Sequence, residues 1–266
     1  MKTRIISAIV MCIIVIPILF IGGIPFKILA ILLSVASMYE ILKARSSKST
    51  IPLIIRFLSY VLVSLFVYLG TSVYSANYEI IYKIMIGVFL LYFIPVVFID
   101  NTEKYSITDA LYVLGCTLFI GVAYNSFIII SNDSINYLIY LLLITVTTDT
   151  FAYFTGYFIG RNKMCEKISP KKTWEGAVGG SIVGTIIPSF FYLYLINPSI
   201  NIYLLLGITL VLSIIGQIGD LFFSSIKRHY KIKDFSNLIP GHGGILDRLD
   251  SIIFVSLAFI LCMSIL

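Results

Sequence analysis

The chain is built almost entirely from long apolar runs that are separated by short polar connections. Nine runs can be read, at approximately residues 5–22, 24–42, 52–70, 79–99, 107–130, 135–160, 175–196, 201–226 and 248–266. A helix needs about 17 to 25 mostly apolar residues to cross a membrane. Because 59% of the 266 residues are hydrophobic and only 12% are charged, a soluble domain could not bury this apolar surface. The sequence therefore predicts an all-α, polytopic integral membrane protein with about nine transmembrane helices.

The basic residues favour one orientation of these helices. Of the 19 lysines and arginines, only Lys27 and Lys83 fall near the face opposite the others. Since cytoplasmic connections are enriched in Lys and Arg, we expect a multi-pass protein of the cell membrane with its N-terminus inside and its C-terminus outside. The first run could instead be a cleaved signal peptide. No small-residue cleavage site follows it, and residues 22–25 (GGIP) are typical of a turn.

The charge and the cysteines exclude several classes of protein. The net charge of +6 comes from short loops beside apolar helices, where anionic lipid headgroups are nearer partners than nucleic acid. The four cysteines are scattered and mostly lie inside apolar runs, so they indicate neither a disulfide framework nor a zinc site. We therefore expect membrane lipid as a partner and no nucleic acid.

We expect residues 1–266 to form a single membrane domain. Residues 1–106 are interpreted as mainly scaffold helices, with a homodimer interface as one of their uses, and residues 107–266 as catalytic helices and cytoplasmic loops. No internal repeat or long linker divides them.

Three acids in the first half of the chain are interpreted as unimportant for chemistry. Glu40, Glu79 and Asp100 all fall near predicted helix ends, where a charged side chain can reach water at little cost.

The sixth predicted helix contains an acid deep in the membrane. Asp149 lies about 12 residues before Arg161, and so about 18 Å from the cytoplasmic end at roughly 1.5 Å per residue. A carboxylate in hydrocarbon costs at least a few kcal/mol unless it faces a polar cavity or partner. Asp149 is therefore a candidate functional residue. The alternative is a protonated or hydrogen-bonded acid that ties helices together.

Glycines predict that the sixth and seventh helices pack tightly. Gly156 and Gly160 lie on the sixth helix, and Gly176, Gly180 and Gly184 repeat every four residues on the seventh. Small residues at this spacing allow helix backbones to approach closely. The alternative, that they only permit bending, explains the regular spacing less well.

The connection between these helices carries a basic segment, SPKKTWEG, at residues 169–176. Lys171, Lys172 and Thr173 precede the seventh helix, where the helix dipole also favours anions. They could bind polyphosphate, or the lysines could be ordinary cytoplasmic loop charge.

A polar stripe runs along the eighth predicted helix. Its members are Gly216, Gln217, Asp220, Ser224 and Lys227, which lie mostly three or four residues apart and so share one face. Such a stripe indicates the wall of a hydrophilic cavity, or else packing against polar residues of another helix.

The densest polar segment follows this helix. Its run PGHGG, at residues 240–244, could offer a flexible nest of N–H donors to an anion. His242 within it could bind phosphate or orient a carboxylate, or could simply be solvated. Asp247 and Asp250 are three residues apart at the start of the ninth helix and share a face, whereas Arg248 points elsewhere.

These segments resemble one known family. The pattern of residues 224–250, SSIKRHYKIKDFSNLIPGHGGILDRLD, resembles the signature of the phosphatidate cytidylyltransferase (CDP-diacylglycerol synthase) family. Residues 147–163 and 169–176 are similar to the same family, so the detailed resemblance covers roughly the C-terminal half. It implies transfer of the cytidylyl group of CTP to phosphatidate, giving CDP-diacylglycerol and pyrophosphate for phospholipid synthesis.

We expect the following roles for the site residues. A divalent cation, Mg²⁺, is expected on Asp220 and Asp247. The residues expected to act in catalysis are Asp220, Asp247, Lys227, Arg228 and Asp250. The residues expected to bind substrate are Lys171, Lys172, Thr173, Ser224, His242, Gly243, Gly244, Arg248 and Asp149.

Two other functions stay open. Buried acids and helix-packing glycines also occur in ion-coupled membrane transporters, although the chemistry here is concentrated in short cytoplasmic loops. A CTP-dependent enzyme acting on another lipid, such as a polyprenol kinase or an ether-lipid cytidylyltransferase, would fit the same segments. The product distinguishes the enzymes, because a kinase releases CDP and a cytidylyltransferase releases pyrophosphate.

Overall fold

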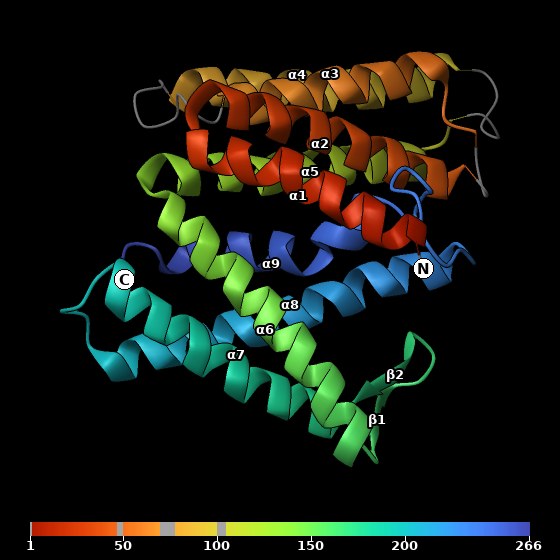
Figure 1. Cartoon of the computed structure of the whole chain (residues 1–266). Helices are drawn as coiled ribbons and strands as arrows, with labels where there is room; N and C mark the ends of the chain where they lie inside the picture. Colours follow the sequence, from red (N-terminus) through yellow and green to blue (C-terminus); the bar gives the residue numbers. More distant parts are fainter. Residues whose placement is uncertain (1, 47–49, 70–77, 100–104) are drawn as a thin grey trace. The chain divides into compact units, whose positions relative to one another are not determined.

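A computed structural model (Figure 1) describes residues 2–46, 50–69, 78–99 and 105–266 of the chain. By internal contacts it divides into two compact units, Met1–Ile129 with Tyr230–Asp247, and Ile130–His229 with Arg248–Leu266. The prediction of a single membrane domain stays a prediction.

The described residues are almost entirely helical, as predicted. The helices are α1 (Lys2–Ile21), α2 (Gly23–Arg45), α3 (Leu53–Leu69), α4 (Tyr78–Phe98), α5 (Ile107–Asp133), α6 (Ile135–Ile159), α7 (Trp174–Leu195), α8 (Ile202–His229) and α9 (Leu246–Cys262). Among the described residues, six helices are long and apolar enough to cross a membrane, and two shorter apolar helices cover Leu53–Leu69 and Lys83–Phe98. The protein is therefore a membrane protein of the predicted all-α class.

The loop between α6 and α7 contains an element that was not predicted. Strands β1 (Lys163–Cys165) and β2 (Ser169–Thr173) pair antiparallel, with Lys163 opposite Thr173. The apolar periodicity that marks the helices is missing from this polar segment, so the short pairing was not detected.

The first unit is held together by buried polar contacts. The Ser37 and Tyr124 hydroxyls lie 2.6 Å apart, and both side chains are fully buried. Arg45 forms an ion pair with Asp109, with 2.6 Å between Nη2 and Oδ1, and its Nη1 reaches the Tyr230 hydroxyl at 3.4 Å. A membrane interior offers no water to unpaired polar groups. Because these polar residues are paired with one another, they can be buried between the helices. The Tyr230 contact also anchors the connection between α8 and α9.

In the second unit, α6 and α7 form the tight pair that the glycines predicted. A Cβ atom added at Gly180 would lie 2.6 Å from the Thr148 carbonyl oxygen and 2.7 Å from the Ala152 Cβ atom. Gly176 is equally close to the backbone of α6, because its added Cβ atom would lie 2.7 Å from the Ala152 carbonyl oxygen. These separations are too short for any side chain larger than hydrogen. The close packing holds the hairpin-bearing ends of both helices together (Figure 1).

Candidate active site

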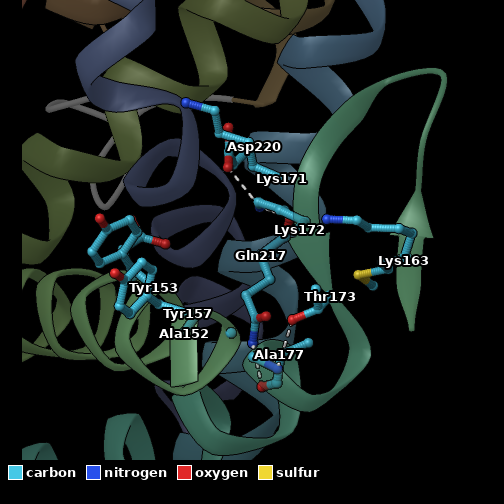
Figure 2. Close-up of a pocket in the computed structure, with 14 residues that line it drawn as sticks. Ala152, Tyr153, Tyr157, Lys163, Lys171, Lys172, Thr173, Ala177, Gln217 and Asp220 are labelled. Atoms are coloured by element: carbon cyan, nitrogen blue, oxygen red, sulfur yellow. Dashed lines mark hydrogen bonds and ion pairs between the residues drawn. The ribbon is translucent and has the colours of Figure 1, made fainter. Parts of the chain in front are cut away.

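The second unit contains a pocket of about 560 Å³. Hairpin residues Lys163, Lys171 and Lys172 line it, together with Asp149 of α6 and Asp220 of α8. Figure 2 shows the hairpin lysines opposite the aromatic residues of α6. Three lysines and two acids in one hollow form a site that can bind phosphate groups and a cation.

Lys172 and Asp220 form an ion pair inside this pocket. Their Nζ and Oδ2 atoms lie 2.6 Å apart, and the Lys172 Nζ also reaches the Gln217 carbonyl oxygen at 3.5 Å. The two side chains keep 25% and 28% of their surface exposed. Both charges can therefore meet a substrate, and the lysine bridges the hairpin to α8 (Figure 2).

Further charges lie beside Asp220. The carboxyl groups of Asp220 and Asp250 share a hydrogen bond, and Asp149 interacts electrostatically with both. Lys227, which is buried, contributes positive charge to the two hydrogen-bonded acids. The Ser224 hydroxyl approaches Asp220 Oδ1 at 3.4 Å. The second unit thus brings together five of the predicted site residues around Asp220.

The paired acids suit a magnesium ion. Carboxylates that lie close together favour a bound cation, because their negative charges repel each other. Within the described part of the chain, no group of three or more His, Cys, Asp or Glu side chains is arranged to hold a metal. Mg²⁺ needs only one or two carboxylates and completes its shell with water and substrate phosphates. The donor set around Asp220 therefore fits this ion.

Side chains of the hairpin and of α7 fix the hairpin to the start of α7. The Thr173 hydroxyl accepts a hydrogen bond from the Gly176 N–H at 3.1 Å and caps α7. Glu175 accepts hydrogen bonds from the Arg161 and Asn162 N–H groups at 3.1 and 3.2 Å. These contacts hold both ends of the hairpin, so Lys171 and Lys172 project from a segment that is fixed at each end.

Two predicted residues of α8 make structural contacts in this unit. Gln217 donates to the Ser181 hydroxyl at 2.8 Å and to the Ala177 carbonyl at 3.3 Å, which joins α8 to α7. Arg228 Nε donates to the Ile168 carbonyl at 3.2 Å and so reaches the turn of the hairpin. The polar stripe therefore serves both of the uses that the sequence left open: Asp220 faces the pocket, and Gln217 packs against another helix.

The aromatic wall of the pocket was not predicted from the sequence. Tyr153 and Tyr157 are 67% and 73% exposed, and their rings stack with centroids 6.3 Å apart. Both line the pocket on the side away from Lys163 (Figure 2). Their spacing of four residues from Asp149 and from each other was the available signal, because it places all three on one face of a helix.

The PGHGG run belongs to the first unit, and three of its N–H groups bond to residues that flank it. The N–H groups of His242 and Gly243 donate to the Ile239 carbonyl at 2.9 and 3.1 Å, and the Gly244 N–H donates to Asp247 Oδ2 at 2.9 Å. Gly243 has φ +87, which L-residues rarely adopt. The expectation of a flexible nest open to an anion is therefore wrong for these three N–H groups. Contact of His242, Gly243 and Gly244 with substrate stays a prediction.

Asp247 has a structural use of its own. Its Oδ2 atom also accepts a hydrogen bond from the Phe235 N–H at 2.9 Å, so this carboxylate closes the connection before α9. Asp247 belongs to the first unit, whereas Asp220, Asp250 and the exposed Arg248 belong to the second. A joint metal site of Asp220 and Asp247 therefore stays a prediction.

The expectation for Glu40 is wrong. Its side chain was expected to reach water near a helix end, but it is fully buried and accepts hydrogen bonds from the connection before α9. The physical reason is that a segment far away in the sequence covers this end of α2. Asp100 and the side chain of Glu79 lie outside the described residues.

Comparison with known proteins identifies the family of this chain. The family model described as "Cytidylyltransferase family" matches residues 2–266. The chain belongs to the cytidylyltransferase family. Among the relatives of this family member, the phosphatidate cytidylyltransferase of Staphylococcus haemolyticus is 36% identical over 256 residues, covering 96% of both chains. The phosphatidate cytidylyltransferase of Bacillus subtilis is 36% identical over 262 residues, covering 96% of this chain and 94% of its own. The resemblance inferred from the sequence is confirmed.

Proposed function

We propose that this protein transfers the cytidylyl group of CTP to phosphatidate, producing CDP-diacylglycerol and pyrophosphate for phospholipid synthesis. The observation that carries the proposal is the pocket in which three lysines and two acids converge, in a chain similar over nearly its whole length to phosphatidate cytidylyltransferases. A transporter needs no such concentration of lysines from a rigid hairpin.

The two walls of the pocket suit the two parts of a lipid phosphate. Lys163, Lys171 and Lys172 can neutralise phosphate oxygens. Tyr153 and Tyr157 offer exposed aromatic rings, which are favoured where a membrane meets water. The volume of about 560 Å³ lies in the usual range for sites that bind small molecules. We therefore assign the lysine wall to phosphate groups and the tyrosine wall to the lipid side.

The chemistry needs no nucleophile from the protein. A phosphate oxygen of phosphatidate attacks the α-phosphorus of CTP, a new P–O bond forms, and the bond from the α-phosphorus to the bridging oxygen breaks. The electron pair leaves with pyrophosphate, and catalysis consists mainly of positioning and charge neutralisation. Lys171 and Lys172 would orient the phosphates, and Lys227 would balance the charge of Asp220 and Asp250.

We propose that Asp220 holds a divalent cation, Mg²⁺, with Asp250 beside it and Asp247 as the second predicted ligand. When bound, Mg²⁺ would neutralise charge that develops on the phosphates. Arg228 and Arg248 remain proposed phosphate contacts, with Thr173, Ser224 and His242 as auxiliary contacts. Asp149 remains a proposed substrate contact from α6.

In the proposed orientation, the pocket opens on the cytoplasmic side of the membrane, where CTP is available. Basic residues concentrate in the hairpin and in the connection after α8, which favours a cytoplasmic location for both. A reporter fused after Leu266 should then behave as extracytoplasmic, and a cytoplasmic signal would contradict the proposed topology. A homodimer is also proposed, and the mass of the purified protein in detergent tests it.

The decisive test is an assay of purified protein with CTP, phosphatidate and Mg²⁺. We expect release of pyrophosphate together with CDP-diacylglycerol, and neither product when phosphatidate is omitted. Release of CDP would indicate a lipid kinase instead. Turnover with another lipid phosphate, in the absence of turnover with phosphatidate, would overturn the proposed substrate.

A further inference from the structure

A buried glutamate of the first unit holds the segment that leads into α9. Glu40, near the end of α2, has none of its surface exposed. Its Oε1 atom accepts hydrogen bonds from the Ser236 hydroxyl at 2.6 Å and the Ile245 N–H at 2.8 Å, and its Oε2 atom accepts from the Leu246 N–H at 2.9 Å. About two hundred residues separate these groups in the chain.

These donors include groups that a helix cannot satisfy by itself. The first N–H groups of an α-helix have no partner within the helix. Leu246 is the first residue of α9, and Ile245 directly precedes it. Glu40 therefore caps α9 from another helix. The negative carboxylate also lies at the end of α9 where the helix dipole favours it.

The Glu40 carboxylate lies so close to Gly244 that no side chain could be placed at that position. A Cβ atom added at Gly244 would lie 2.5 Å from Glu40 Oε1 and 2.7 Å from its Cδ atom. Both oxygen atoms of Glu40 accept N–H bonds. A glutamine would turn one acceptor into an NH₂ donor that faces a backbone N–H group, so one of these hydrogen bonds would be lost.

The same short segment orients Asp247, the residue that follows Leu246. Asp247 Oδ2 accepts hydrogen bonds from the N–H groups of Phe235 and Gly244. Glu40 binds the two residues directly before Asp247 and the hydroxyl of Ser236, next to Phe235. The two carboxylates therefore hold one segment, and displacing Glu40 would displace the start of α9.

We infer that Glu40 is a positioning residue, which acts through the N-terminal end of α9 to set the place of Asp247. The part of this inference that concerns catalysis rests on the proposed function, in which Asp247 is a predicted ligand of the cation. In the proposed reaction, Glu40 contacts no reacting atom. Its contribution to the reaction is the fixed starting point of α9.

The test compares Glu40→Gln with Ser37→Ala. Ser37 lies on the same helix, is also fully buried, and loses one buried hydrogen bond to Tyr124 when it is replaced. It therefore controls for a general loss of stability in the first unit. Ser236→Ala removes only one of the three hydrogen bonds to Glu40 and supplies a milder variant in case Glu40→Gln does not fold.

Two readouts separate positioning from stability. Hydrogen–deuterium exchange of the amides in residues 235–247, measured without substrates, should be at least about tenfold faster in Glu40→Gln, because the Ile245 and Leu246 N–H groups lose an acceptor. The turnover number should fall by about 10- to 100-fold, since small misplacements of reacting groups cost rate on this order, and the Mg²⁺ concentration for half-maximal rate should rise. Ser236→Ala should change both readouts in the same direction by less, and Ser37→Ala should leave both within about twofold.

Two outcomes of these measurements would overturn the inference. Unchanged exchange of residues 235–247 in Glu40→Gln would show that Glu40 does not hold the segment. An equal loss of turnover in Ser37→Ala and Glu40→Gln would assign the effect to stability alone. An inactive wild-type protein would overturn the proposed function, and the exchange comparison would still decide whether Glu40 holds the start of α9.

Discussion

Two carboxylates, Glu40 and Asp220, have opposite surroundings although both lie on apolar helices. Glu40 has no exposed surface and three hydrogen-bond donors, two of them backbone N–H groups. The Asp220 side chain is 28% exposed in a pocket, and its partners are the side chains of Lys172 and Ser224 and another acid. A buried acid satisfied by the backbone supports structure, whereas an acid with side-chain partners and access to a pocket can exchange them for a ligand. The difference separates the residue that holds a segment from the residue that meets substrate.

The largest expected effect comes from the acids proposed to bind the cation. Asp220→Asn and Asp247→Asn nearly preserve size but remove charge, so each should lower turnover by about 100-fold or more, the scale on which single electrostatic contacts in active sites act. Turnover at saturating CTP and a Mg²⁺ titration measure this, with insertion and purification as controls. Near-wild-type turnover with an unchanged Mg²⁺ dependence would contradict the proposed metal site.

An intermediate effect is expected from a lysine of the pocket. Hydrogen bonds to charged groups contribute about 1.5–3 kcal/mol, or roughly 10- to 100-fold at about 1.4 kcal/mol per tenfold. Lys171→Ala should therefore lower kcat/KM for CTP or phosphatidate by that factor. Lys167, an exposed lysine of the same hairpin, is the matched control, because it does not line the pocket. Equal effects of Lys167→Ala and Lys171→Ala would mean that the hairpin lysines act through their overall positive charge and not through contacts inside the pocket.

The smallest effect on activity, but a clear effect on stability, is expected from a change in the contact between α6 and α7. Gly180→Leu should force α6 and α7 apart and cost roughly 1 to 3 kcal/mol, as overpacking usually does. Gly207→Leu is the control, since nothing lies within 4 Å of a Cβ atom added there. Thermal unfolding in detergent should distinguish the two variants. Wild-type stability and full turnover of Gly180→Leu would contradict the tight packing of this helix pair.

The sequence predicted what depends on local pattern. The apolar runs placed the nine described helices to within a few residues; for example, 135–160 was expected where α6 covers Ile135–Ile159. The four-residue glycine repeat predicted the α6–α7 contact, because spacing along a helix determines which residues share a face.

The sequence did not predict what depends on distant partners. Whether Glu40 reaches water is decided by residues 236–246, which cover it only in the folded chain. Pairing of Lys163 with Thr173 leaves no periodic signal in so short a segment. In the sequence, Tyr153 and Tyr157 belong to one apolar helix face among many, and only the folded chain places them beside the pocket.

Thr173 restricts what evolution can change around the pocket. Its Oγ1 atom lies within 2.9 Å of the positions that Cβ atoms would take at Gly156, Gly160 and Gly176. A methyl group at any of these glycines would collide with the threonine, so these four positions, in α6, directly after α6, in β2 and in α7, cannot vary independently. Gly156→Ala should lower the free energy of unfolding by less when Thr173 is also replaced by glycine. The two substitutions alter the same contact, so their effects on the free energy of unfolding should not add. In diverging members of the family, these positions should be exchanged together or remain unchanged.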